Sequence, residues 1–179
     1  SFRSIDLIRE GEIIDSVDLY DTFIFGKPSF GKRLRSGDII HINPSLNQVS
    51  VIGGVKRPNT YELKEDESLE IAITFANNLN SFADLSKIRV FRVKQGEIEA
   101  IQIDNLTQLD SMISKDFDSI VVGEYKYKKV SIEGAVENPG DYLLKEGDGI
   151  TNAIKRAGGY TKEAYVFGSI LENSATREI

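Results

Sequence analysis

The side chains with the clearest chemical potential are one histidine and several groups of carboxylates. His41 is the only histidine, and imidazole is the usual proton-transfer group near neutral pH. Paired carboxylates serve glycoside hydrolysis, but only at defined separations across a cleft. Acidic groups occur at three places: Glu65-Asp66-Glu67, Asp116 with Asp118, and Glu146 with Asp148. Because these fall in predicted loops, we interpret them as solvated surface, and the lone strand histidine as structural.

The sequence lacks the residues for nucleophilic or cofactor chemistry. There is no cysteine, no G-x-S-x-G elbow, no P-loop and no Rossmann glycine pattern, and calcium-loop spacing is also absent. Without cysteine, disulfides and thiolate metal sites are excluded. We therefore predict no catalytic residue, no metal site and no cofactor, and do not expect an enzyme.

A turn rich in polar side chains is the best candidate for ligand binding. Around Pro58, the side chains of Arg57 and Asn59 could donate hydrogen bonds to sugar hydroxyls, and Tyr61 could stack on a sugar face. The alternative is that Pro58 and Tyr61 build the turn and pack its underside. Both interpretations concern the same residues, so the sequence leaves them open.

The same turn recurs later in the chain, with Asn138 and Tyr142 in place of Arg57 and Tyr61. The predicted ligand-binding residues are therefore Arg57, Asn59, Tyr61, Asn138 and Tyr142. Repetition favours the turn-building role, because both copies need the same fold. Only the positive charges of the first turn, on Lys56 and Arg57, have no counterpart in the second turn, which has Glu137 and Asn138 at these positions.

Composition narrows the classes of partner. The chain has 179 residues, a hydrophobic content of 40% and a net charge of −6, as in an ordinary soluble globular protein. A negative charge argues against nucleic acid, whose binding domains are usually basic. No apolar run is long enough to span a membrane, so we expect no membrane segment in this chain.

One stretch of the chain occurs twice. VSVIGGVKRPNTYELKEDESLEIAITFANNLNSFA begins at Val49 and aligns without a gap with VSIEGAVENPGDYLLKEGDGITNAIKRAGGYTKEA, which begins at Val130, 81 residues later. The turn proline is shared, as Pro58 and Pro139. Chance does not give so many ungapped matches, so the chain contains an internal repeat.

Each repeat predicts a strand, a tight turn, a short strand and a helix. In the second repeat the turn is Asn138–Asp141, where proline fixes φ and glycine allows φ > 0. Asp148 or Thr151 is expected to cap the helix, and Gly158-Gly159 to end it. Asn77-Asn78 replaces the two glycines in the first repeat, and asparagine tolerates left-handed φ.

The repeat resembles the SLBB domain, a soluble-ligand-binding variant of the β-grasp fold. The resemblance rests on the pattern G-x-V-x-x-P-(G/N)-x-Y-x-L and on a following helix that ends in Ala-Gly-Gly. SIDLIREGEIIDSVDLYDTFIFG and RLRSGDIIHINP resemble the stretch between two such copies, so the resemblance covers nearly the whole chain. It implies an α+β fold of tandem β-grasp modules, each a mixed sheet with one short helix.

The pattern divides the chain into three predicted copies. Residues 49–122 form a complete SLBB-like domain, residues 1–43 the C-terminal half of a preceding copy, and residues 130–179 the N-terminal half of a further copy. Together the two halves hold one module's worth of strands. We expect them to complement one another, within the chain or head-to-tail between chains; the alternative is that each packs on the central copy.

The SLBB resemblance implies a function. The family is best known from periplasmic and outer-membrane polysaccharide export proteins. A non-catalytic module would build an assembly or bind the exported glycan, with polysaccharide and other copies of itself as partners, in the periplasm and attached to the outer membrane in the full-length protein. The alternative is an independent β-grasp binding module for another small soluble ligand, since this fold hosts many functions. An enzyme acting on glycans is a third hypothesis, which the missing catalytic residues disfavour.

Overall fold

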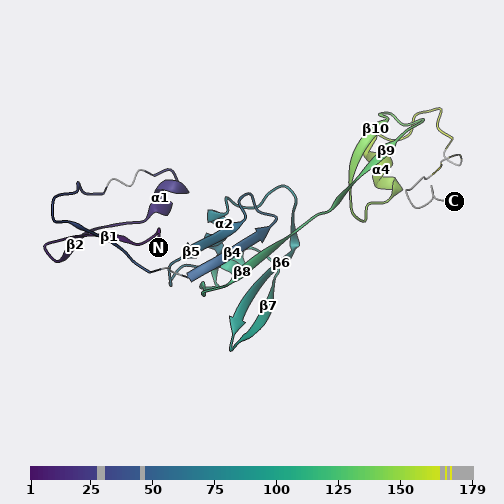
Figure 1. The fold of residues 1–179 in the computed structure, drawn as a ribbon. Helices are drawn as coiled ribbons and strands as arrows, with labels where there is room; N and C mark the ends of the chain where they lie inside the picture. Colours follow the sequence, from purple (N-terminus) through teal and green to yellow (C-terminus); the bar gives the residue numbers. More distant parts are fainter. Residues whose placement is uncertain (28–30, 45–46, 166–167, 169, 171–179) are drawn as a thin grey trace, which may run out of the picture. The chain divides into compact units, whose positions relative to one another are not determined.

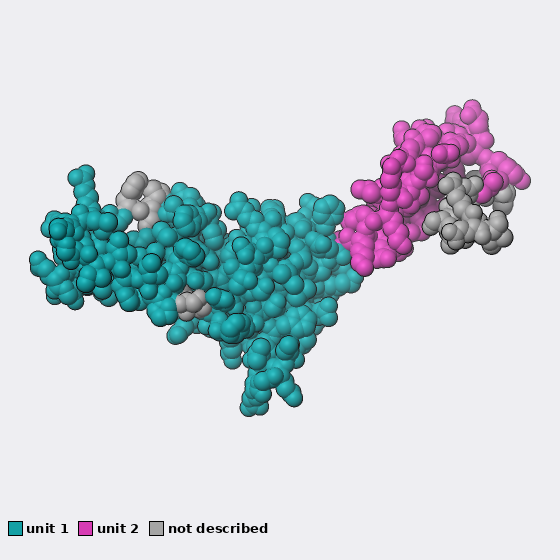
Figure 2. Space-filling model, in the orientation of Figure 1, with its two compact units in different colours: residues 1–124 teal, residues 125–179 magenta. Residues whose placement is uncertain are grey.

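The structure is a computed structural model that describes residues 1–27, 31–44, 47–165, 168 and 170. The chain divides into two compact units, residues 1–124 and residues 125–179 (Figures 1 and 2). Three sheets are described, of three, five and two strands. Over these ranges no helix is both long and apolar enough to cross a membrane. The division into three sequence copies stays a prediction.

The first unit begins with a small antiparallel sheet. Its strands lie in the order β2-β1-β3, with bounds β1 (Ile5–Arg9), β2 (Glu12–Val17) and β3 (Ile39–Ile42). The β1–β2 turn places Glu10 and Gly11 at φ of 52° and 87°. Between β2 and β3 comes the short helix α1 (Leu19–Phe23), where the Asp18 side chain accepts a hydrogen bond from the Tyr20 backbone N–H.

The central part of the first unit is a mixed five-stranded sheet in the order β5-β4-β8-β6-β7. Its elements are β4 (Asn47–Gly53), β5 (Asn59–Leu63), α2 (Leu69–Phe75), β6 (Ala83–Lys94), β7 (Glu97–Ile103), α3 (Thr107–Asp110) and β8 (Ser119–Glu124). Only β4 and β8 run parallel, and the other neighbours are antiparallel. This mixed sheet with short helices confirms the predicted α+β fold.

The core of the central sheet lies between its strands and α2. Leu69, Ala72 and Ile73 of α2 are buried against strand residues such as Val51 and Ile120. These strand positions are β-branched and alternate along β4 and β8, as a half-buried sheet requires. One face of α2 is therefore buried against one face of the central sheet.

The short helix α3 was not predicted from the sequence. It spans four residues, too few for a helical period to emerge. Leu109 is nevertheless fully buried, and the Leu69 N–H donates to the carbonyl of Met112 at 2.8 Å. The central copy thus has two short helices where one was expected.

The second unit repeats the first part of the central copy. β9 (Tyr127–Ile132) and β10 (Gly140–Lys145) form an antiparallel pair, and α4 (Ile150–Arg156) follows them. The core of this unit is small, and its buried residues are Ile132, Val136, Leu144, Ala153 and Ala157. Figure 1 shows α4 lying against the hairpin. Residues 171–179 of the predicted third copy lie outside the described residues.

The start of α4 differs from the predicted cap. Gly149 occupies the N-cap position and no side chain caps the helix there. Asp148 instead accepts hydrogen bonds from the Lys145 backbone N–H at 3.0 Å and from Asn152 Nδ2 at 2.9 Å, and Thr151 lies inside the helix. The carboxylate therefore closes the turn after β10, because the Lys145 N–H is within its reach.

A buried arginine joins the N-terminal sheet to the central copy. Arg3 is 6% exposed and pairs with Asp18 at 3.0 Å and with both carboxylate oxygens of Glu67. Its guanidinium lies 5.1 Å from the ring centroid of Tyr20 and 4.9 Å from that of Phe75, and these two rings also contact each other. Burial opposes the charge, but hydrogen bonds to the two carboxylates leave the pKa of Arg3 above its usual value.

Candidate functional site

The first predicted ligand turn is held by the end of helix α2. The Arg57 N–H donates to the carbonyl of Ala76 at 2.9 Å, and the Lys56 N–H to the carbonyl of Asn78 at 3.0 Å. Asn77 and Asn78 have φ of 59° and 65°, so the predicted left-handed stop is confirmed. The turn and the helix end therefore form one rigid surface loop.

The second turn repeats this arrangement. The Asn138 N–H donates to the carbonyl of Ala157 at 2.9 Å, and the Glu137 N–H to that of Gly159 at 3.0 Å. Gly158 and Gly159 have φ of 86° and 95°, which confirms the predicted helix stop. The same residue types at the same spacing give the same backbone bonds in both units.

The two tyrosines support these turns from below. The Tyr61 hydroxyl donates to the carbonyl of Arg57 and the Tyr142 hydroxyl to that of Asn138, each at 2.6 Å. Tyr61 is 7% exposed and its ring lies 6.0 Å from that of Phe75. Little of this ring is open for stacking on a sugar, so the geometry favours the turn-building role for the tyrosines.

Most of the polar side chains of the two turns are exposed to solvent. Arg57, Asn59 and Asn138 are exposed, and Tyr142 is half-buried. Asn59 begins strand β5, with its side-chain oxygen accepting a hydrogen bond from the Thr60 N–H at 2.8 Å. The side-chain amide of Asn138 donates one hydrogen bond to the Ala157 carbonyl at 3.4 Å, which leaves its second N–H for a ligand. Ligand binding at these residues stays a prediction.

The charge difference between the turns has a structural explanation. Helix α2 carries no basic residue in its last turn, whereas α4 carries Lys155 and Arg156. Lys56 and Arg57 are bonded through their backbones to the end of α2. Positive charges near a helix C-terminus interact favourably with the helix dipole. Lys56 and Arg57 place two such charges near the end of α2, whereas α4 carries its own in Lys155 and Arg156.

Three of the acidic residues interpreted as solvated surface are paired with arginines. Asp118 is fully buried and binds Arg92 Nε and Nη2 at 2.8 and 2.6 Å. Glu67 binds Arg3, and Asp148 lies 3.3 Å from Arg156. The solvated interpretation was wrong for these residues, because the fold brings each carboxylate beside an arginine, 64 residues away for Glu67, 26 for Asp118 and eight for Asp148. Their pairing is structural and leaves no free acid–base pair.

Two aspartates have strongly lowered pKa values. Hydrogen bonds from the Arg9 guanidinium hold the pKa of Asp38 at about 2. The Ser86 hydroxyl, assisted by Lys87, lowers the pKa of Asp84 to about 2. Both carboxylates therefore stay ionised near neutral pH and are poor proton donors.

Neither a proton-transfer site nor a metal site emerges from the described residues. His41 lies in β3, exposed and opposite Asp6 in the register with β1. Throughout the described ranges, no group of three His, Cys, Asp or Glu residues could hold a metal ion.

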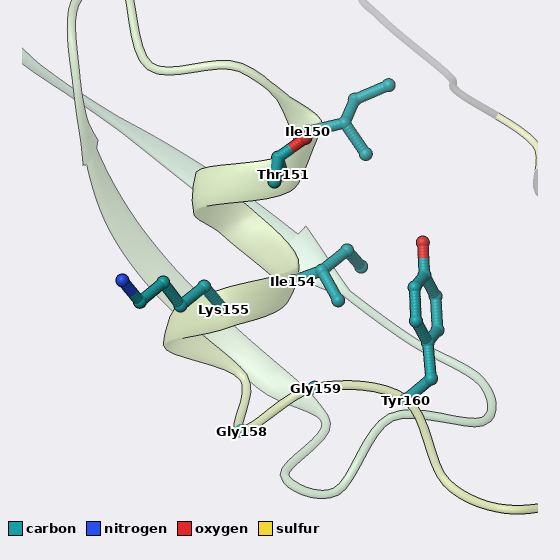
Figure 3. A pocket seen from close by; sticks show the side chains of 7 residues that line it. All are labelled: Ile150, Thr151, Ile154, Lys155, Gly158, Gly159 and Tyr160. Atoms are coloured by element: carbon teal, nitrogen blue, oxygen red, sulfur yellow. The ribbon is translucent and has the colours of Figure 1, made fainter.

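An apolar hollow on α4 was not predicted from the sequence. It measures about 390 Å³ and is lined by Ile150, Thr151, Ile154, Lys155, Gly158, Gly159 and Tyr160. In Figure 3, Ile150 and Ile154 project from the helix on the side of the Tyr160 ring. The available signal was the spacing of Ile150, Ala153, Ile154 and Ala157, which places these apolar residues on one face of a helix.

Comparison with known proteins identifies the family. The SLBB domain model matches residues 48–102 and 129–171, which is more than half of the chain. The chain therefore belongs to the SLBB domain family, as its repeat pattern predicted. No curated protein matches the sequence. SLBB domains are binding domains for soluble ligands, which agrees with the exposed polar turns and the paired acids.

Proposed function

We propose that the chain is a non-catalytic module of a polysaccharide export protein, acting in the periplasm and attached to the outer membrane in the full-length protein. The observation that carries the proposal is the tandem match of SLBB domains at 48–102 and 129–171. Such modules are common in polysaccharide export proteins. The role is to build an assembly of copies or to bind the exported glycan.

Glycan contact belongs to the exposed turns. Arg57 in the first unit and Asn138 in the second carry hydrogen-bond donors on backbone fixed by a helix end, and Asn59 carries them at the start of β5. These few exposed contacts bury little area, so we expect weak binding, which suits a glycan that must be released again. The net charge of −6 makes neutral glycans better partners than acidic ones, except at the cationic turn of Lys56 and Arg57.

An NMR titration of the chain with neutral and acidic oligosaccharides tests glycan binding. We expect amide shifts around Arg57 and Asn59 that disappear in Arg57→Ala and persist in Arg89→Ala, a control at another exposed arginine on β6. Amide shifts confined to Glu146–Asp148 would show that the glycan binds there and not at the first turn. An absence of shifts with every oligosaccharide would leave only an assembly role.

The export role needs a test in the producing cell. Deleting the gene of the full-length protein should remove polysaccharide from the cell surface while its synthesis continues inside. Unchanged surface polysaccharide would favour the alternative of a binding module for another small soluble ligand. A screen of small metabolites by the same amide shifts would then identify the ligand class.

A further inference from the structure

The start of the second hairpin has a composition unlike the rest of the chain. Residues 125–129 read Tyr-Lys-Tyr-Lys-Lys, with three positive charges and no negative charge, in a chain of net charge −6. The matching residues of the central repeat, 81 positions earlier, read Pro-Ser-Leu-Asn-Gln and carry no charge. Both repeats form a hairpin in the same register, so this fold does not require the tyrosines and lysines.

The hairpin of β9 and β10 has a core face and an outer face. In β10, Leu144 is 7% exposed and belongs to the small core of the unit, whereas Leu143 is 59% exposed. Side chains alternate along a strand, so Leu143 and Lys145 lie on the outer face. Tyr127 is opposite Lys145 in the register. Lys129 is opposite Leu143, so this tyrosine and this lysine also belong to the outer face.

Tyr125 lies beside these outer-face residues. Lys145 Nζ is 3.5 Å from the centroid of the Tyr125 ring, which is a cation–π contact. Tyr127 and Lys129 are exposed, and Tyr125 and Lys145 are half-buried. Two phenol rings and two ammonium groups are therefore grouped at one place on the second unit. We call these four residues the Tyr–Lys cluster.

The lysines here are available to an anionic ligand. Lys129 Nζ lies 2.8 Å from Asp141 Oδ2, and Lys128 Nζ, next to the cluster, lies 3.9 Å from Glu146 Oε1. All four of these side chains are more than half exposed, so both ion pairs are weak and a ligand can replace the carboxylates. Among the described residues, Lys145 forms no ion pair and contacts the Tyr125 ring instead.

The outer face of such a hairpin stays open in a complete copy. In the central copy, the counterparts of Lys129 and Lys145 are Gln48 and Lys64, and both are exposed although five strands and α2 are present. Helix α2 packs on the other face, with the core. The exposure of the Tyr–Lys cluster therefore does not depend on which strands complete the second unit.

We propose that the Tyr–Lys cluster binds an acidic polysaccharide through sugars that carry carboxylates. A sugar ring has an apolar face of C–H groups that packs on a tyrosine ring, and its hydroxyls bond to phenol hydroxyls. A sugar carboxylate accepts charge-assisted hydrogen bonds from lysine ammonium groups. The cluster offers both kinds of contact side by side, because Tyr127 and Lys145 are directly opposite each other on neighbouring strands.

The charge of the chain favours an acidic glycan over nucleic acid. Outside residues 125–129 the chain is more negative than its net charge of −6, so most of its surface repels a densely charged phosphate backbone. The same repulsion confines acidic glycans to places of local positive charge, which are this cluster and the turn of Lys56 and Arg57. The inference rests on the proposed glycan role and adds to it a second site and a class of glycan.

An NMR titration of the full chain with a short oligogalacturonate tests the site, and a neutral galactose oligomer of the same length is the comparison probe. We expect the acidic probe to shift amides at residues 125–129 and 143–145. Added salt should weaken this binding, because it screens the attraction between carboxylates and exposed lysines. The neutral probe should bind the cluster about tenfold more weakly, since it lacks the charge-assisted hydrogen bonds.

Substitutions separate the two kinds of contact. Lys145→Gln should weaken binding of the acidic probe about tenfold, because a charged donor is lost. Tyr127→Ala should weaken it about fivefold, whereas Tyr127→Phe keeps the ring and should retain most of the affinity. Lys162→Gln is the matched control, since Lys162 is an exposed lysine outside the cluster and should not contribute. The amide spectrum of each free variant shows whether the hairpin is intact.

Each other outcome has a distinct meaning. Equal weakening in Lys145→Gln and Lys162→Gln, or equal binding of both probes at the cluster, would overturn the inference. Shifts with the acidic probe confined to residues 56–59 would also overturn it, but would leave the proposed glycan role intact. No shift with either probe at any residue would remove glycan binding altogether. Tighter binding of a single-stranded oligonucleotide or of anionic lipid vesicles at the cluster would assign it to a different partner.

Discussion

The central copy and the C-terminal unit share a local structure but differ in what covers it. The hydroxyl bonds of Tyr61 and Tyr142 to the turn carbonyls have the same length, 2.6 Å. Leu69 in α2 is fully buried, whereas Ile150, at the matching place in α4, is 57% exposed. Among the described residues of the C-terminal unit, the hairpin and helix therefore take the same shape with only β9 and β10 as strands.

This difference separates two kinds of stabilisation. The turn and helix-end bonds join residues that are close in sequence, so they form at a small cost in chain entropy. The core around Leu69 instead gathers strands from residues 47–124, and its hydrophobic burial depends on all of them. Substitutions should therefore have similar effects at shared turns and different effects at matching core positions.

The largest expected difference is at the matching leucine and isoleucine. Leu69→Ala should lower the free energy of unfolding of the first unit by about 2–5 kcal/mol, because it leaves a cavity in a closed core. Ile150→Ala should cost less than about 1 kcal/mol in dilute protein, since an exposed side chain loses little buried area. Urea unfolding of each variant measures both values. Equal losses would show that α4 is covered in the monomer.

The next difference is at matching glycines. Gly53 and Gly134 have φ of 85° and 90°, but a Cβ on Gly53 would lie 1.9 Å from the Val122 carbonyl oxygen, whereas a Cβ on Gly134 meets nothing within 4 Å. Gly134→Ala should therefore cost only the conformational strain, about 1–2 kcal/mol. Gly53→Ala should cost clearly more, because backbone of β8 must move. Thermal unfolding of the two variants measures both losses. A loss in Gly53→Ala no larger than that in Gly134→Ala would mean that β8 can shift to accommodate the Cβ.

A smaller effect is expected at the helix stop that both copies share. Gly158→Ala and Gly159→Ala each place a Cβ at positive φ, which costs about 1–2 kcal/mol. Gly158→Ala should lose more, since its Cβ would lie 2.8 Å from the side-chain Nδ2 of Asn138, whereas a Cβ on Gly159 would meet nothing within 4 Å. Asn77→Gly is the control and should be close to neutral, because glycine adopts the same φ. Unchanged melting temperatures in both alanine variants would contradict the capping role.

The sequence was most informative where the repeat supplied the same evidence twice. The hairpins, the helices α2 and α4 and their left-handed stops were predicted, because these depend on nearby residues such as Pro139 and Gly158. Four-residue α3 was missed, since its stability comes from the burial of Leu109 and from tertiary contacts. Tertiary packing decides short elements that propensity alone does not specify.

The candidate site was less accessible from sequence. The turn residues were located correctly as a pair of matching loops, but the burial of Tyr61 depends on Phe75 of α2. The partner of Glu67 is Arg3, 64 residues away, so a local charge pattern could not reveal it. The fold decides which charged residues pair, and the sequence shows only which charged residues are present.

The final comparison follows the Arg9–Asp38 pair of the N-terminal sheet at different pH values. The pKa of Asp38 is lowered to about 2 by Arg9, below the value of about 4 expected in the unfolded chain. Its contribution to stability is therefore complete above about pH 4 and is lost as the pH falls toward 2. Asp38→Asn should be less stable than the wild type at pH 7, and the gap in urea midpoints should close between pH 4 and 2. Asp21→Asn, at a carboxylate whose side chain is 51% exposed, should follow the wild type throughout. A gap for Asp38→Asn that stays constant down to pH 2 would mean that the carboxylate charge is not what stabilises this sheet.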